Sequence, residues 1–379
     1  MRLLDRYLLR ELLIPLGYCL GGFLLLWVAL DLFNELNAFQ RLHLKGGEVL
    51  LYYLVKTPEF LVLVFPIALL LALLYSLSNH ARYHEITAIR AAGVSLWRLS
   101  LPYLGVGFFA SLSLFALNEF WVPVSADAAE HIRNRHSPAA SSSAGRDKVL
   151  NPVVTNSREH RLWHIGVYDL KTGTMMKPQV ISTFPDGSEI TLDADRASYQ
   201  DGAWTFYQVR ERRKTTNSWV PVVTLLTNVL ARPDFSETPD QIKSDIRISA
   251  SLSTLSLKGA KKTDLSVREI LNYLRLNPNP AQGASLLYTK LHGRLAAPWT
   301  CLVVVLIAIP FGAASGRRNV FVGVASSLVI FLIYYGLQLV CPAVGASDVL
   351  KGSWVPWAAA WFPNMAFGVA GIWMTARVR

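Results

Sequence analysis

Residues 12–30 read LLIPLGYCLGGFLLLWVAL, a run of 19 residues without a charged side chain. A helix needs about 20 apolar residues to cross the hydrocarbon core of a bilayer, so this run predicts a transmembrane helix. Arg2, Arg6 and Arg10 precede it, as in a signal peptide. The run is longer than a signal-peptide core and no small-residue cleavage site follows. We therefore expect a retained first helix.

Five further stretches of similar length complete a predicted set of six transmembrane helices. The chain of 379 residues is 52% hydrophobic and 17% charged, whereas soluble proteins carry about 25% charged residues. Most charges lie between Asp127 and Lys290, which predicts lipid around both ends of the chain and water around its middle. The five stretches are residues 60–77, 99–117, 295–315, 320–340 and 353–376.

The basic residues of the short loops predict the orientation, because cytoplasmic loops of membrane proteins collect Lys and Arg. We expect both termini in the cytoplasm and the middle domain in the periplasm. The net charge of +11 is explained in this way, so no nucleic-acid partner is expected. The predicted cytoplasmic side holds Arg2, Arg6, Arg10, Arg82, Arg90, Arg98, Arg317, Arg318, Arg377 and Arg379, and the other side holds Arg41, Lys45, Lys56 and Lys351.

The middle of the chain has the pattern of an antiparallel β domain. Short segments rich in Val, Ile, Thr, Trp and Tyr are separated by turn signals such as Asp201-Gly202. Ser266 and Glu269 form a capping box that predicts a closing helix. The expected fold is an α+β membrane protein, with residues 1–123 and 291–379 forming helices one to three and four to six around a β domain of residues 124–290. The predicted strands are residues 161–170, 177–184, 189–199, 203–213 and 219–230.

Motifs of enzymes are missing from the sequence. No Walker A, H-E-x-x-H or G-x-S-x-G pattern occurs. Asp193-Ala-Asp195 falls in a predicted strand, and His80 with His84 lacks a nearby third ligand, so we expect polar loop residues rather than metal ligands. The sequence predicts no catalytic residue, no metal and no cofactor.

Residues 80–98, HARYHEITAIRAAGVSLWR, follow the second predicted helix. Ile86 and Ile89 share one helical face, Glu85 and Arg90 lie on others, and Gly93 is a natural helix end. The pattern predicts a short cytoplasmic helix at about residues 79–95. The residues alone leave two interpretations open: an amphipathic helix on the inner leaflet, or a docking helix for a cytoplasmic partner.

The stretch EITAIRAAGVS at residues 85–95 resembles the coupling helix of the lipopolysaccharide-export permeases of the LptF/LptG family. Three further stretches resemble that family in the same order along nearly the whole chain: LDRY at 4–7, LHGRLAAP at 291–298 followed by Ile309-Pro310, and WFPN at 361–364. The resemblance implies an inner-membrane permease that pairs with a paralogous permease as a heterodimer. It also implies a cytoplasmic ATPase dimer as a separate subunit, which agrees with the missing Walker A motif.

In such a permease, lipopolysaccharide passes from a lateral cavity onto a periplasmic β-jellyroll domain. A bridge of similar domains then carries it toward the outer membrane. The resemblance assigns ATPase coupling to Glu85, Ile86, Ile89, Arg90 and Gly93, with Glu85 at the acidic position of the helix. A solvated charge is the competing interpretation for Glu85.

Two further groups of residues follow from the resemblance. Arg133, Arg135, Arg41 and Lys45 are candidates for binding the lipid headgroup, because basic side chains pair with phosphate; solvated surface charges are the alternative. Gly17 and Gly21 on helix 1 and Gly323 and Ser326 on helix 5 are candidates for a gate, because small residues let helices approach closely. Ordinary packing within the chain is the alternative for these.

One stretch departs from the family pattern. The outer end of helix 1 reads DLFNELN at residues 31–37, where family members often carry basic residues. Either the anionic headgroup is bound elsewhere or the cargo differs, and Asp31 is a functional candidate or a simply solvated interfacial group. The alternative function is a mechanotransmitting ABC subunit that acts on a periplasmic partner without carrying lipid.

Overall fold

The computed structural model describes residues 3–133, 148–215, 221–255, 266–277, 284–313, 320–347, 352 and 354–377. The chain divides into two compact units. One is helical and comprises residues 1–136 and 285–379, and the other comprises residues 137–284 and contains a β-sheet. The sheet unit begins later than the sequence predicts because a helix continues past residue 123, and it ends earlier because the next helix already begins at Ala284.

The stretches predicted to cross the membrane are helical over nearly all of the residues that the structure describes in them. Five helices are long and apolar enough to span a bilayer within the described ranges. The C-terminal helix α11 covers the sixth predicted stretch but is not among those five. The helices are α1 (Leu3–Arg41), α2 (Gly46–Arg82), α3 (Glu85–Ala91), α4 (Leu96–Ala116), a π-helical turn (Leu117–Trp121), α5 (Val122–Arg133), α8 (Ala284–Ala296), a 3₁₀ turn (Ala297–Trp299), α9 (Thr300–Ala313), α10 (Val320–Ala346) and α11 (Val355–Arg377).

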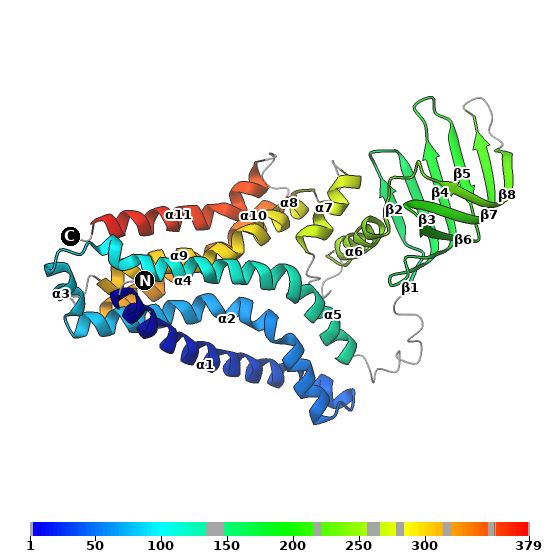
Figure 1. Ribbon diagram of the computed structural model, residues 1–379. Coiled ribbons are helices and arrows are strands. Elements are labelled where there is room, and N and C mark those ends of the chain that lie inside the picture. The colour runs from blue at the N-terminus through cyan, green and yellow to red at the C-terminus, as the bar shows by residue number, and fades with distance from the viewer. Residues whose placement is uncertain are drawn as a thin grey trace. The chain divides into compact units, whose positions relative to one another are not determined.

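The helical unit has a buried centre and two exposed helices. The helix pair α8–α9 and helix α2 form the centre, with 67% and 56% of the residues in their most apolar windows buried. The corresponding fractions are only 11% for α1 and 17% for α10. Figure 1 shows α3 and both chain termini at the same end of this unit. Most of the apolar windows of α1 and α10 are therefore exposed in the isolated chain.

A buried hydrogen-bond network joins the last three long helices. The Tyr334 hydroxyl of α10 donates to Asn364 Oδ1 of α11 at 2.6 Å, and Gln338 Nε2 donates to the same oxygen at 2.8 Å. Asn364 Nδ2 donates to the Ala296 carbonyl at 2.7 Å. The Tyr334 hydroxyl also lies 3.0 Å from Thr300 Oγ1 in the first turn of α9. Because unpaired polar groups are costly inside a membrane, this network fixes α10 and α11 against the end of α8 and the start of α9.

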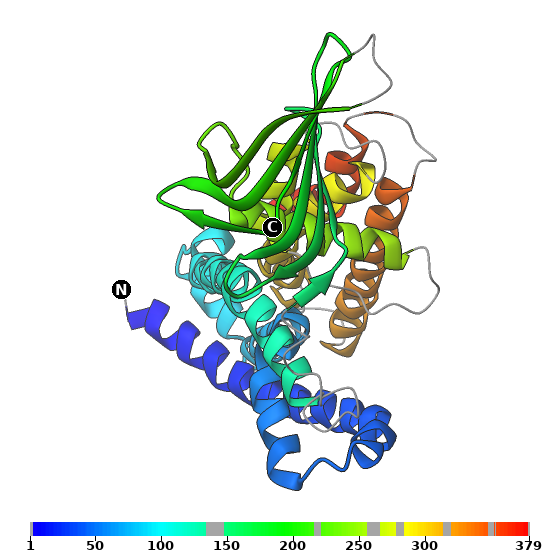
Figure 2. The ribbon, with the colours of Figure 1, turned by 90° about the vertical axis from the view of Figure 1, so that its right-hand side faces the viewer.

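The second unit is built on an antiparallel sheet of eight strands. Each long strand pairs with its neighbours in sequence, and Figure 2 shows the strands lying side by side. The pairings of β5 with β7 and of β4 with β6 join strands that are not neighbours in sequence. The strands are β1 (Lys148–Leu150), β2 (Val153–Asn156), β3 (Arg161–Asp169), β4 (Met175–Thr183), β5 (Glu189–Asp193), β6 (Arg196–Gln200), β7 (Ala203–Lys214) and β8 (Val222–Arg232).

All five predicted strands are present, and their turns explain the register. Asp201 and Gly202 both have positive φ, 50° and 81°, which is the type I′ turn typical of an Asp-Gly hairpin. The predicted strand at residues 189–199 is interrupted at Ala194 and Asp195, where β5 ends and β6 begins. The short strands β1 and β2 were not predicted.

Two helices complete the sheet unit. Helix α7 (Val267–Leu276) begins with the predicted capping box of Ser266 and Glu269. Helix α6 (Pro239–Leu255) was not predicted, although its start has the same chemistry: Thr238 N donates to Gln241 Oε1 and Gln241 N donates to Thr238 Oγ1. Ile242 of α6 packs into the core of the sheet.

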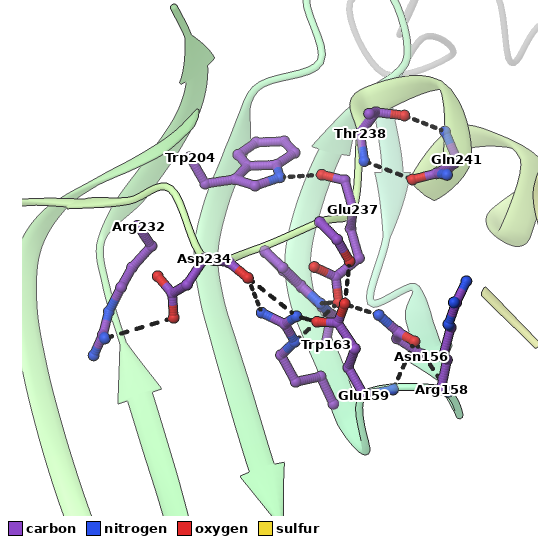
Figure 3. A network of polar contacts seen from close by, with 12 residues as sticks. Asn156, Arg158, Glu159, Trp163, Trp204, Arg232, Asp234, Glu237, Thr238 and Gln241 are labelled. Carbon is purple, nitrogen blue, oxygen red and sulfur yellow. Dashed lines mark hydrogen bonds and ion pairs between the residues drawn. The ribbon is translucent and has the colours of Figure 1, made fainter. Parts of the chain in front are cut away.

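Aromatic side chains dominate that core and surround a buried carboxylate. Trp163, Trp204 and Phe206 are fully buried. Glu237 is fully buried as well, and its Oε1 accepts hydrogen bonds from Asn156 Nδ2 at 2.7 Å and Trp163 Nε1 at 3.3 Å (Figure 3). The side chain of Arg161 pairs with the same oxygen at 3.3 Å. The polar atoms of this network lock β2 and β3 to the segment that enters α6.

A second buried carboxyl group makes the stability of the sheet unit depend on pH. Burial raises the pKa of Asp245 on α6 to about 7. The folded state therefore keeps a proton that the unfolded chain releases near pH 4, and this contribution to stability is lost as the pH rises through about 7. We expect the free energy of unfolding of this unit to fall by about 3 kcal/mol between pH 5 and pH 8.

The variant Asp245→Asn should flatten this pH dependence. The exposed Asp240 lies on the same helix, so Asp240→Asn is the matched control and should keep the wild-type slope. Hydrogen–deuterium exchange of the sheet peptides in the full-length protein, at pH 5 and pH 8 with correction for the intrinsic rate, measures the effect. If the free energy of unfolding of Asp245→Asn depends on pH as strongly as that of the wild type, Asp245 is not the cause of the pH dependence.

Candidate functional site

The predicted coupling helix is α3, and it is shorter than predicted. Residues 79–82 belong to α2, and His84 adopts a left-handed conformation with φ of 58° that separates the two helices. Helix α3 ends at Ala91, and Gly93 follows with φ of 83°. This left-handed conformation favours glycine, which explains why the helix stops there.

The apolar face of α3 points into the helical unit rather than toward lipid. Ile86 is buried in the main cluster of the bundle, and Ile89 is half-buried against it. Thr87 and Ala88 lie on the exposed face, and Arg90 is half-buried in the last turn. The burial of this face favours the interpretation as a docking helix, and α3 presents its polar face outward.

Glu85, the first residue of α3, makes its contacts inside the chain. Its two carboxylate oxygens accept hydrogen bonds from the Tyr7 hydroxyl of α1 at 3.2 and 3.1 Å. His80 Nδ1 of α2 lies 2.7 Å from Oε2. Our expectation that His80 is a loop residue is wrong, because His80 lies in the last turn of α2 and is only 2% exposed.

A neighbouring ion pair joins α1 to the helix that follows α3. Arg98 Nη2 of α4 lies 3.0 Å from Asp5 Oδ2 in the first turn of α1. The Ser95 hydroxyl caps α4 by accepting a hydrogen bond from the Arg98 amide. No sequence signal pointed to Tyr7 or Asp5 as contacts of this segment, because they lie 78 and 93 residues from their partners.

The acidic residue Asp31 in the C-terminal half of α1 is compensated by a lysine of α2. Lys56 Nζ lies 3.0 Å from Asp31 Oδ2 and lies over the rings of Tyr52 and Phe60 at 5.3 and 5.0 Å. The spacing of the two residues in the sequence could have predicted this ion pair. Asp31 precedes the end of α1 at Arg41 by ten residues, and Lys56 follows the start of α2 at Gly46 by ten. An antiparallel helical hairpin therefore places the two side chains at the same height along the helix pair.

The candidate headgroup residues fall at the connections of the helices. Arg41 ends α1 and Lys45 precedes α2, and both are exposed. A groove of about 550 Å³ beside them is lined by residues including Phe39 and His43. Arg133 is the last residue of α5, and its side chain lies outside the described residues, as does the whole of Arg135.

The gate candidates on α1 face open space in this chain. A Cβ built on Gly17 or Gly21 meets no atom within 4 Å in the described residues, so packing within the chain does not explain these glycines. Ser326 of α10 is half-buried, and the surroundings of Gly323 lie outside the described residues. Helix α1 packs on α2 and α4, whereas α10 packs on α9, α11 and α2.

The structure offers no metal centre in the ranges it describes: no group of three or more His, Cys, Asp or Glu side chains there could hold a metal ion. Cys19, Cys301 and Cys341 are free thiols in the helical unit. The helical unit is a set of apolar helices that a few polar contacts link near their ends.

Comparison with known proteins agrees with this architecture. A search of the curated proteins finds no match. The family model described as "Lipopolysaccharide export system permease LptF/LptG" matches residues 6–377. Because this match covers both units and nearly the whole sequence, the chain belongs to the LptF/LptG family of lipopolysaccharide export permeases.

Proposed function

We propose that this chain is one subunit of an ATP-driven exporter that extracts lipopolysaccharide from the inner membrane and passes it toward the outer membrane. The exposed apolar surfaces of α1 and α10 carry the proposal. Leu26 and Phe33 of α1 and Leu332 of α10 are all more than half exposed. A lipid cargo and a second permease subunit are the surroundings that such surfaces accept in a membrane.

The proposed topology has six transmembrane helices, with α11 as the sixth. Both termini lie in the cytoplasm, and the sheet unit, inserted between the third and fourth helices, lies in the periplasm. The common end of α3 and the two termini supports this assignment (Figure 1). The excess of Arg in the loops of the same side supports it too.

Three protein partners follow from the proposal. A paralogous permease packs against α1 and α10 as the other half of a heterodimer, and a cytoplasmic ATPase dimer contacts α3 through Arg90 and its exposed face. A periplasmic bridge protein pairs with β8, which contacts only β7 among the described strands and exposes Val222, Leu226 and Val229. A free strand edge of this kind accepts a further strand.

The lipid headgroup contacts Arg41, Lys45, Arg133 and Arg135 in this proposal. Asp31 does not repel an anionic cargo, because Lys56 already neutralises it. The departure from the family pattern at the outer end of helix 1 thus changes where the phosphates bind and leaves the cargo the same.

The same ion pair supports the second candidate function. A mechanotransmitting subunit that moves no lipid needs no basic residue at the outer end of α1, and Lys56 is engaged by Asp31. Such a protein would use ATP-driven movement of α3 to act on a periplasmic partner, without a lateral cavity for lipid.

Site-specific photocrosslinking in cells separates the two functions. A photoreactive residue at Leu26 or at Leu332 should give lipopolysaccharide adducts that depend on active ATPase. The same residue at Phe109, which is exposed on α4, serves as the control and should give only ATP-independent contacts with lipid. Protein adducts without lipopolysaccharide at Leu26 and Leu332 would favour the mechanotransmitter.

A further inference from the structure

The carboxylate of Glu85 is a junction between three helices. Its two oxygens belong to α3, the Tyr7 hydroxyl that donates to them belongs to α1, and His80 belongs to the last turn of α2. The rings of Tyr7 and His80 also contact each other, with centroids 5.6 Å apart. Both oxygens of Glu85 are thus engaged within the chain.

The first turns of α1 hold both flanks of α3. On one flank Tyr7 and His80 meet at Glu85, and on the other flank Asp5 pairs with Arg98 at 3.0 Å. Helix α3 has only seven residues and lies between the end of α2 and the start of α4. A displacement of α3 therefore reaches α1 through polar contacts at its base, although α1 and α3 are separated by the whole of α2 in the sequence.

Helix α1 is suited to respond to such a displacement. Only 11% of its most apolar window is buried, although Leu8, Leu12 and Leu16 near its start pack into the main cluster of the bundle. Charge-assisted hydrogen bonds are directional and about twice as strong as neutral ones. The polar contacts at its base therefore add a directional link between α1 and α3 to this apolar packing.

We propose that Tyr7 and Glu85 are positioning residues that transmit the movement of α3 to α1. Tyr7 binds no nucleotide and no cargo; it acts through Glu85 and sets the position of α1. The inference rests on the proposed function, because it takes the ATPase as the source of the movement of α3 and the lipid pathway as the place where α1 acts.

The contact can be removed without unfolding the protein. Tyr7 is 41% exposed, and the Glu85 side chain is 32% exposed, and contacts at such positions contribute little to stability. Tyr7→Phe removes one hydroxyl and keeps the ring against His80. Tyr75→Phe is the matched control, because Tyr75 is an exposed tyrosine of α2 at 62% without a role in this junction.

The test uses the complete exporter in proteoliposomes and measures lipopolysaccharide released per ATP hydrolysed. Tyr7→Phe should leave ATP hydrolysis near the wild-type rate and lower this ratio about fivefold, because it removes a partly exposed hydrogen bond to a carboxylate. Tyr75→Phe should keep the wild-type ratio. A wild-type ratio in Tyr7→Phe would overturn the inference.

A double-mutant cycle adds a readout that a structural role would not move. If Tyr7 acts through Glu85, the variant Tyr7→Phe combined with Glu85→Ala should be no more uncoupled than Glu85→Ala alone. If the double variant lowers the lipopolysaccharide released per ATP by the product of the two single-variant factors, the two residues act independently. That result would overturn the inference.

A cargo-independent readout separates this inference from the proposed function. Spin labels at Leu26 on α1 and Leu332 on α10 should report a change in distance when ATP is added to the wild-type exporter. Tyr7→Phe should lose that change. A wild-type exporter that releases no lipopolysaccharide would contradict the proposed function alone, whereas an undiminished distance change in Tyr7→Phe would contradict the transmission contact.

Discussion

Glu237→Ala is expected to lower the free energy of unfolding of the sheet unit by about 3–5 kcal/mol. Glu237 is fully buried and accepts hydrogen bonds from Asn156 and Trp163. Arg161 pairs with it and is itself only 7% exposed. Alanine leaves the two donors without their acceptor and removes the buried one of the two carboxylates that pair with Arg161. A loss of this size is a large part of the 5–15 kcal/mol that typically holds a domain together.

The control for this variant removes the other carboxylate that pairs with Arg161. Glu159 also pairs with Arg161, but its side chain is 35% exposed, so Glu159→Ala should cost less than about 1 kcal/mol. Hydrogen–deuterium exchange of the β3 and β7 peptides in the full-length protein measures both variants. Equal effects of the two would show that the buried network does not hold the sheet unit together.

Gly371→Val is expected to destabilise the helical unit by about 3 kcal/mol. A Cβ on Gly371 of α11 would lie 2.9 Å from the backbone carbon and oxygen of Leu306 on α9. Backbone atoms in a packed helix cannot move aside as a flexible side chain does. The valine therefore forces α11 away from α9 and strains the hydrogen bonds of Asn364 on the same helix.

Gly368 supplies the matched control one turn away. A Cβ on Gly368 meets no atom within 4 Å among the described residues, so Gly368→Val carries the same change in helix propensity without the clash. Unfolding by denaturing detergent in mixed micelles should show a clear loss of stability for Gly371→Val only. A similar loss in both variants would place the cause in helix propensity rather than in packing.

The sequence predicted the elements of the fold because the signals for them are local. Runs of apolar residues predicted stretches that are helical over nearly all of their described residues. The Asp201-Gly202 turn predicted a hairpin whose two central residues both have positive φ. The helix α6 was missed although Thr238 and Gln241 carry a capping signal. The π-helical turn at Leu117–Trp121 left no local pattern in the sequence that we recognised.

The candidate sites were predicted less completely because they depend on contacts between distant residues. Gly93 was predicted as the end of α3 from its own chemistry, and its φ of 83° confirms it. The contacts of Glu85 with Tyr7 and of Asp5 with Arg98 join residues 78 and 93 positions apart. Neither spacing nor composition encodes such pairs, so the sequence showed Glu85 as an outward charge and the structure shows it as an internal junction.

The most direct test of the central claim is transfer of lipopolysaccharide in a reconstituted system. The complete exporter would be placed in proteoliposomes loaded with lipopolysaccharide, and a photoreactive soluble bridge protein would be added outside. The account predicts lipopolysaccharide adducts on the bridge protein that accumulate with ATP and are absent without it. ATP hydrolysis with movement of α3 but no lipopolysaccharide adduct would contradict the account and favour a mechanotransmitting subunit.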